Sequence, residues 1–140
     1  MIYFTMNRPI SVFIIDDDLD DQLLMRQAFE ATMVPVTVEF ATKSEEALMY
    51  LSKCEPSEQP DIIVSDYNMP MMNGKEFLLR LLEKEQYKQT PKVILSTAAS
   101  PTIVESCMSN GAFLYLLKPC NFDALVTLAK KILSLVLSTS

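Results

Sequence analysis

Histidine is absent from the 140-residue chain, and glycine occurs only twice. Without histidine the chain lacks the commonest general base of enzymes, and it can form neither a Ser-His triad nor a histidine-ligated metal site. Two glycines are too few for a glycine-rich phosphate loop or a dinucleotide-binding fingerprint. A flavodoxin-like module that binds a nucleotide is therefore a poor interpretation of this sequence.

Cysteines are also few, and long apolar runs are missing. Cys54, Cys107 and Cys120 are odd in number and lack the spacing of a metal site, so we expect reduced thiols in a cytoplasmic protein. No stretch approaches the roughly 20 apolar residues of a membrane span. The N-terminus has no continuous apolar segment of the kind found in signal peptides. We therefore expect no membrane partner.

Positive charge is in the minority, with 12 basic against 18 acidic residues and a net charge of −6. A nucleic-acid-binding surface over the whole domain would need a basic patch, so we expect no nucleic-acid partner. Hydrophobic residues make up 49% of the chain and charged residues 21%, as in an ordinary globular domain. The length suits one domain with a substantial core.

An apolar run that stops at a carboxylate lies in the middle of the chain. Residues 62–64 are consecutive and β-branched, which is typical of a strand buried on both faces. Asp66 stands where this strand would end, and Pro70 and Gly74 mark the turn that follows. In an open parallel sheet, ligands bind at this end of the strands.

Strands and helices are predicted to alternate along the whole chain. We expect strands at 11–15, 36–40, 62–66, 92–96 and 112–117, and helices at about 19–32, 43–53, 75–86, 101–110 and 122–137. This alternation predicts an α/β fold with one parallel sheet, helices on both faces and right-handed crossovers. No linker, internal repeat or second domain is indicated.

Local signals mark several helix ends. Residues 42–45 fit a capping box, and Ser100 followed by Pro101 fits a helix start. Asp20 and Asp21 lie in the first turn of the first helix, where the helix dipole favours negative charge. The last helix is richer in apolar residues than one packed face requires. Its excess predicts a second apolar face for a partner or for self-association, although a leucine-rich helix with a frayed end would explain it equally.

Ionisable side chains follow three of the predicted strands. Asp16 and Asp17 come after the first, Asp66 after the third and Lys118 after the fifth. Crowded carboxylates repel one another and resist ionising, unless a hard divalent cation such as Mg²⁺ removes that cost. We therefore expect an acidic Mg²⁺ pocket with a nucleophile candidate and one ammonium group.

A hydroxyl pair, Ser96-Thr97, ends the fourth predicted strand and completes this set. The inventory fits phosphoryl transfer, in which positioning and charge neutralisation provide most of the catalysis. Aspartate is a known covalent phosphate acceptor. Taken alone, the acidic run 16–21 would be as consistent with a solvated helix cap, and Asp66 with a turn former. The coincidence of acids and Lys118 at strand ends favours a site.

Four blocks of the sequence resemble the receiver (CheY-like) domain of two-component response regulators. They are Phe13-Ile14-Ile15-Asp16-Asp17, Ser65-Asp66-Tyr67-Asn68-Met69-Pro70 with Gly74, Ser96-Thr97-Ala98, and Tyr115-Leu116-Leu117-Lys118-Pro119. The resemblance covers about 9–137 and leaves an N-terminal extension, 1–8, and a C-terminal tail, 138–140. It implies the doubly wound (βα)5 flavodoxin-like fold, with strand order 2-1-3-4-5.

The resemblance assigns roles to residues of these blocks. Asp66 would take a phosphoryl group from a phosphohistidine. Asp16 and Asp17 are preferred over Asp18 as the acids that would hold Mg²⁺, together with Asp66 and the backbone carbonyl of Asn68. Lys118 would neutralise the phosphoryl charge and pair with Asp66.

Further roles concern the switch between two conformations. Ser96, preferred to Thr97 for its spacing from Lys118, would hydrogen-bond the phosphoryl oxygens. Tyr115 would change rotamer when Ser96 moves, although an aromatic with no switching role remains an alternative. The Lys118–Pro119 peptide bond is expected to be cis, because proline lowers the free-energy cost of the cis form.

The resemblance therefore implies a stand-alone, cytoplasmic response regulator of bacterial type, and not an enzyme acting on an external substrate. A sensor histidine kinase or a histidine phosphotransfer protein would phosphorylate it. Output would come from a downstream protein target or from self-association through the fourth and fifth helices. Two alternatives remain: a receiver-like adaptor that never meets phosphate, and a small Mg²⁺-dependent phosphatase of the haloacid dehalogenase kind. The phosphatase would need a second acid where Asn68 stands.

Overall fold

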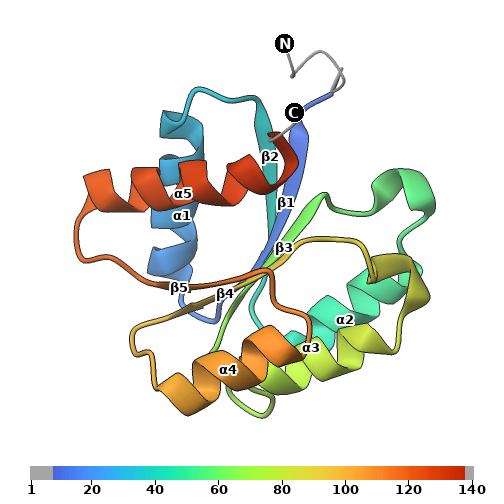
Figure 1. Ribbon diagram of the computed structural model, residues 1–140. Helices are drawn as coiled ribbons and strands as arrows, with labels where there is room; N and C mark the ends of the chain where they lie inside the picture. The colour runs from blue at the N-terminus through green and yellow to red at the C-terminus, as the bar shows by residue number, and fades with distance from the viewer. Residues whose placement is uncertain (1–7, 138–140) are drawn as a thin grey trace.

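Five apolar runs form one parallel sheet in the computed structural model, which describes residues 8–137 (Figure 1). The strands are β1 (Ile10–Ile15), β2 (Val36–Ala41), β3 (Ile62–Asp66), β4 (Lys92–Ser96) and β5 (Leu114–Leu117). Their order across the sheet is β2-β1-β3-β4-β5, and every neighbouring pair is parallel. The predicted α/β class and strand order are confirmed. The predicted extension and tail lie outside the described residues, except for Arg8.

Helices cover both faces of the sheet (Figure 1). They are α1 (Leu19–Ala31), α2 (Ser44–Lys53), α3 (Gly74–Leu82), α4 (Pro101–Ser109) and α5 (Phe122–Leu137), with two short 3₁₀ helices, η2 (Pro56–Glu58) and η3 (Glu85–Tyr87). α1 and α5 pack against each other on one face, while α2, α3 and α4 lie side by side on the other. No helix within 8–137 is both long and apolar enough to cross a lipid bilayer.

The sheet separates two apolar cores. Along β1, Val12 and Ile14 face the core under α1 and α5, whereas Phe13 and Ile15 face the core under α2 and α3. All four are buried, as expected for a strand whose alternate side chains point to opposite covered faces. Because apolar packing holds β1 from both sides, it gives the polar groups at its end a rigid base.

Two predicted helix features are wrong. The expected capping box at 42–45 does not form, because Lys43 takes the N-cap position of α2 and the Thr42 amide donates to Glu46 Oε1 at 3.1 Å rather than to Glu45. The buried Ser44 hydroxyl donates to the Met72 carbonyl. The third helix ends at Leu82 rather than near residue 86. Beyond it the chain turns into η3, which brings Tyr87 into the core, where its hydroxyl donates to a backbone carbonyl of α2.

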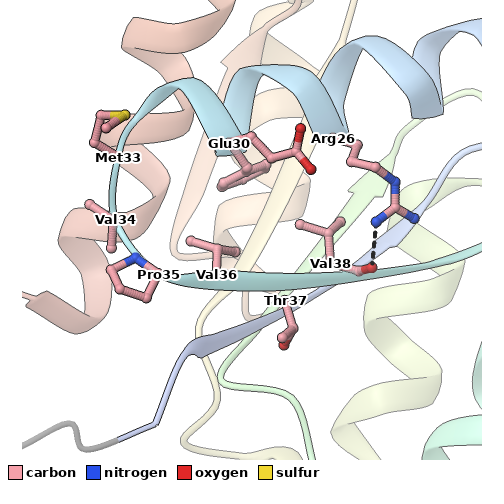
Figure 2. Close-up of a pocket in the computed structure, with 9 residues that line it drawn as sticks. Arg26, Glu30, Met33, Val34, Pro35, Val36, Thr37 and Val38 are labelled. Carbon is pink, nitrogen blue, oxygen red and sulfur yellow. Dashed lines mark hydrogen bonds between the residues drawn. The ribbon is translucent and has the colours of Figure 1, made fainter.

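A groove of about 570 Å³ lies beside β2, the strand at one edge of the sheet (Figure 2). Arg26 lines it, donates to the Val38 carbonyl at 3.4 Å and places its guanidinium 5.0 Å from the centre of the Phe40 ring. The side chain thus covers part of an edge strand that has a neighbour on one side only. Because the groove borders the first half of β2, it lies away from the strand ends that carry the acids.

Candidate functional site

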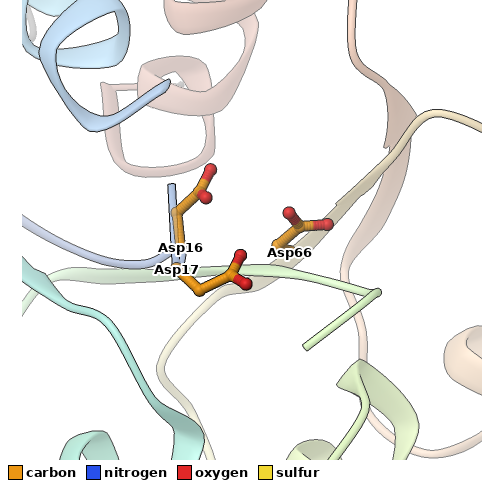
Figure 3. A group of neighbouring side chains, drawn as sticks. All are labelled: Asp16, Asp17 and Asp66. Carbon is orange, nitrogen blue, oxygen red and sulfur yellow. The ribbon is translucent and has the colours of Figure 1, made fainter. Parts of the chain in front are cut away.

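The carboxyl ends of β1 and β3 bring three aspartates together. Asp16 and Asp17 follow β1, and Asp66 is the last residue of β3, the neighbouring strand. Each contributes a carboxylate oxygen, and these oxygens all lie within 4.8 Å of one another (Figure 3). The prediction that folding gathers these acids at one edge of the sheet is confirmed.

Lys118 joins this group from the end of β5. Its Nζ lies 3.1 Å from Asp16 Oδ2, 3.0 Å from Asp66 Oδ2 and 3.0 Å from Asp21 Oδ2. An ammonium has three protons to donate, so these contacts use all of them. Burial would lower the pKa of Lys118, but the surrounding carboxylates, Asp66 first, raise it above its ordinary value. The side chain therefore stays charged.

Asp16 is the most deeply placed of the three strand-end acids, with its side chain only 3% exposed. Burial raises the pKa of Asp16, although the Asp18 amide donates to its Oδ1 at 2.9 Å and Lys118 lies close by. Four carboxylates, with that of Asp21, thus gather at this edge of the sheet, and one ammonium contacts three of them. The excess of negative charge and the all-oxygen donor set fit a hard divalent cation such as Mg²⁺.

Asp18, the third acid of the run 16–18, caps a helix instead of joining the group. Asp18 is the N-cap of α1, and its Oδ1 accepts the backbone amides of Asp20 at 2.8 Å and Asp21 at 3.2 Å. A carboxylate at this position satisfies free amides and interacts well with the helix dipole. The structure therefore brings Asp16 and Asp17, and not Asp18, into the acidic group.

Ser96 lies at the same edge as Asp66. It ends β4, and the residue paired with Asp66 in the sheet is its neighbour Leu95. Ser96 is buried and its Oγ accepts the Ala98 amide at 3.2 Å, whereas Thr97 is exposed. The preference for Ser96 over Thr97 thus agrees with burial, and its role toward a phosphoryl group stays a prediction.

Tyr115 reaches the same residue, Ala98, from β5. Its hydroxyl donates to the Ala98 carbonyl at 2.9 Å. Ser96 and Tyr115 therefore hold the loop between β4 and α4 through two hydrogen bonds to one residue. Movement of the Ser96 side chain would break the first bond and disturb the position of the second.

Comparisons with known proteins point to one family. A family model described as "Response regulator receiver domain" matches residues 12–130. The Arabidopsis thaliana protein named two-component response regulator ARR17 is 31% identical over 123 residues, which cover 82% of this chain and 79% of the relative. The chain belongs to the response regulator receiver family.

Solved structures agree with this receiver in fold. The phosphorylated cyanobacterial phytochrome response regulator RcpA matches with a TM-score of 0.83 and 27% identity, over 94% of this chain and 96% of that one. The Vibrio cholerae chemotaxis response regulator CheY4 matches with a TM-score of 0.75 and 30% identity, over 89% and 98%. These relatives come from plants and bacteria, so the bacterial origin of this receiver stays a prediction.

The predicted cis bond before Pro119 of this receiver is wrong. The described residues contain no cis peptide bond, so Lys118–Pro119 is trans. The trans form is favoured before proline by about 0.5–1 kcal/mol. In this form the Lys118 amide donates to the Ser96 carbonyl at 2.8 Å and the side chain still reaches the acids.

The loop after Asp66 is held close to the acid. The Asn68 amide donates to Asp66 Oδ1 at 3.2 Å, and the Gly74 amide donates to the Tyr67 carbonyl at 2.8 Å. A Cβ on Gly74 would lie 3.0 Å from the Tyr67 Cα, so this close approach favours glycine. The loop thus keeps Asn68 beside the acids, and ligation of a metal by its carbonyl stays a prediction.

Sequence reasoning missed Asp21, which it placed in the first helical turn for the dipole alone. A signal was present, because Asp21 stands four residues before Met25, a core residue of α1, and so shares its side of the helix. Asp20 stands four residues before Leu24, which the structure leaves exposed, and Asp20 is exposed as well. The helical spacing therefore separates the acid that faces the sheet from the one that faces solvent.

Proposed function

We propose that this receiver is a phosphoacceptor of a two-component or phosphorelay system and takes a phosphoryl group onto Asp66. The single observation that carries the proposal is the junction of Asp66 with two further acids and the Lys118 ammonium at one edge of the sheet. A carboxylate oxygen of Asp66 attacks the phosphorus of a phosphohistidine. The P–N bond breaks, its electron pair stays on the imidazole nitrogen, and an acyl phosphate forms.

The residues around Asp66 suit this reaction. Asp16, Asp17, Asp66 and the Asn68 carbonyl would hold Mg²⁺, which supplies positive charge to the phosphoryl oxygens. Lys118 already touches Asp66 Oδ2 and needs only a small shift to donate to a phosphoryl oxygen. The Asn68 amide keeps the other oxygen of Asp66 oriented. Fixed donors of this kind stabilise charge without reorganising during the reaction.

Phosphorylation would shift the population of two conformations of the loop after β4. Ser96 turns its hydroxyl from the Ala98 amide to a phosphoryl oxygen, and the loop then moves with the Tyr115 hydroxyl attached to it. The phosphoryl group favours this conformation because only there does it gain the Ser96 contact. The protein acts through this shift and has no external substrate beyond its phosphodonor.

Output would pass through the surface of α4, β5 and the start of α5. Large apolar side chains are exposed there: Met108, Phe113, Leu117 and Phe122. The rest of the apolar excess of α5 packs on the sheet core, with residues such as Leu125 half-buried. A protein target or a second copy would cover this surface, and a sensor histidine kinase or phosphotransfer protein would supply the phosphoryl group. A cytoplasmic location of the protein would suit both kinds of partner.

The test is phosphate uptake from phosphoramidate in the presence of Mg²⁺, followed by intact-mass measurement. We expect the natural chain to gain one phosphoryl group and Asp66→Asn to gain none, because the amide has no nucleophilic carboxylate. The control variant Asp20→Asn removes a charge from an exposed neighbour and should take up phosphate normally. Uptake by Asp66→Asn equal to that of the natural chain would contradict the site. A chain that binds neither Mg²⁺ nor phosphate would instead be an adaptor.

A further inference from the structure

Asp21 lies beside the acidic group without belonging to it. Its carboxylate, 40% exposed, is 3.0 Å from Lys118 Nζ, but it is not one of the three aspartates whose oxygens converge on a common point. The cap residue Asp18 and the core residue Met25 fix the first turns of α1 and therefore the direction of this side chain. Asp21 thus approaches the ammonium from α1, while the other acids approach it from the sheet.

The three partners of the ammonium differ in what else they must do. Asp16 Oδ1 already accepts the Asp18 amide, so its Oδ2 would serve both Lys118 and a metal ion. Asp66 Oδ1 likewise accepts the Asn68 amide and its Oδ2 the Lys118 ammonium. One of these carboxylate oxygens would also form the bond to phosphorus in the acyl phosphate. Of the three contacts to Lys118, only the one with Asp21 is independent of metal binding and of phosphorylation.

A bound divalent cation would therefore change the environment of Lys118. It would draw electron density from two of the three carboxylates and repel the ammonium at close range. Without a third partner, Lys118 would compete with the metal for the shared oxygens of Asp16 and Asp66. This competition would weaken metal binding.

We infer that Asp21 is a positioning residue for Lys118, which its carboxylate keeps beside the phosphoacceptor while a metal ion engages the other two acids. The inference rests on the proposed function, since it assigns Asp21 a part in the same site. Asp21 touches neither the metal nor the phosphoryl group and acts through the ammonium alone.

The experiment is an isothermal titration of the full chain with MgCl₂, for the natural sequence, Asp21→Asn and Asp20→Asn at one ionic strength. The two variants lose the same charge from adjacent positions of one helical turn, but only Asp21 contacts Lys118. We expect Asp21→Asn to bind Mg²⁺ about tenfold more weakly, as when partners of metal ligands are removed elsewhere. Asp20→Asn should stay within about twofold of the natural chain, because charges in water are screened.

A second pair of variants separates positioning from charge. In a Lys118→Met background, Asp21→Asn should weaken Mg²⁺ binding no more than Asp20→Asn does, so that the two substitutions at positions 21 and 118 are not additive. Circular dichroism checks the fold of each variant. If Asp21→Asn perturbs the fold, Asp21→Ser replaces it in the Mg²⁺ titrations.

Equal Mg²⁺ affinity of Asp21→Asn and Asp20→Asn would overturn the inference. The same loss from Asp21→Asn with and without Lys118 would also overturn it, because Asp21 would then act by charge alone. A natural chain that bound no Mg²⁺ and took up no phosphate would refute the proposed function, and the inference with it. A natural chain that did both, with no specific effect at Asp21, would refute only the inference.

Discussion

Ala98 connects the two residues expected to switch. Its amide donates to Ser96 Oγ and its carbonyl accepts a hydrogen bond from the Tyr115 hydroxyl, so both flanking strands hold one residue of the loop. Ser96 is buried at the strand end, while Thr97, one residue later, points into solvent. At the residue scale, burial and direction therefore select which hydroxyl can meet a group on Asp66.

Replacing each hydroxyl by alanine tests this selection. We expect Ser96→Ala to slow phosphate uptake from phosphoramidate by roughly tenfold, since a donor aimed at developing charge contributes about 10²-fold in a closed site and less in an open one. Thr97→Ala is the matched control and should react at the rate of the natural chain. Time courses by intact mass measure both rates. A larger loss from Thr97→Ala would reverse the assignment.

At the element scale, Asp61 ties the start of β1 to the start of β3. Its carboxylate accepts a hydrogen bond from the Ser11 amide at 2.8 Å and one from each Nη atom of Arg8, at 2.7 and 2.8 Å. Burial would raise the pKa of Asp61, but the Arg8 and Ser11 hydrogen bonds lower it overall. This contact lies at the opposite end of the strands from the acidic group, so its loss tests stability without touching the acids.

The lowered pKa of Asp61 predicts an acid-dependent part of the stability. The folded state binds the proton of Asp61 less readily than the unfolded chain. The contribution is therefore complete above the ordinary aspartate value of about 3.9 and is lost as the pH falls through the lower folded value. Asp61→Asn should cost about 1 kcal/mol at pH 7, because Arg8 is largely exposed and its ion pair screened.

Urea unfolding at pH 7 and at stepwise lower pH measures this effect. Below about pH 4 the natural chain and Asp61→Asn should converge in stability, because the natural chain loses the charged contact there. Glu105→Gln, on the exposed side of α4, removes a charge that makes no such contact. Its free energy of unfolding should follow that of the natural chain at every pH. A constant gap between Asp61→Asn and the natural chain at every pH would contradict the assignment.

At the scale of the whole molecule, the fold holds carboxylates together against their mutual repulsion. Two apolar cores fix β1 and β3 from both faces, and the acids of these strands cannot separate without disturbing that packing. One ammonium neutralises only part of their charge. A cation that binds the folded arrangement, and not the unfolded chain, should therefore stabilise the entire domain.

We expect Mg²⁺ to raise the unfolding temperature. At a free Mg²⁺ concentration 100 times the dissociation constant, the free energy of unfolding should rise by about 2.7 kcal/mol. Differential scanning calorimetry with MgCl₂ measures it, and NaCl at equal ionic strength is the control for screening. The double variant Asp16→Asn/Asp17→Asn should lose the specific gain, because the amides do not replace the anionic ligands. An equal gain in that variant, or from NaCl, would show that no such site exists.

The sequence by itself determined which segments form the sheet and which residues stand at the strand ends. β4 and α5 occupy the predicted residues, because their apolar patterns are strong and local. A parallel sheet must gather its strand ends, so the meeting of Asp16, Asp17, Asp66 and Lys118 could be predicted without coordinates.

Only the tertiary structure decided the contacts between distant segments. Ser44 bonds the remote Met72 carbonyl at the start of α2, and Tyr87 follows the early end of the third helix into the core, because buried partners outweigh local preference. The contact of Asp21 with Lys118 depends on where α1 and β5 come to lie. Local patterns specify elements, whereas the partners of a side chain depend on packing that brings remote residues together.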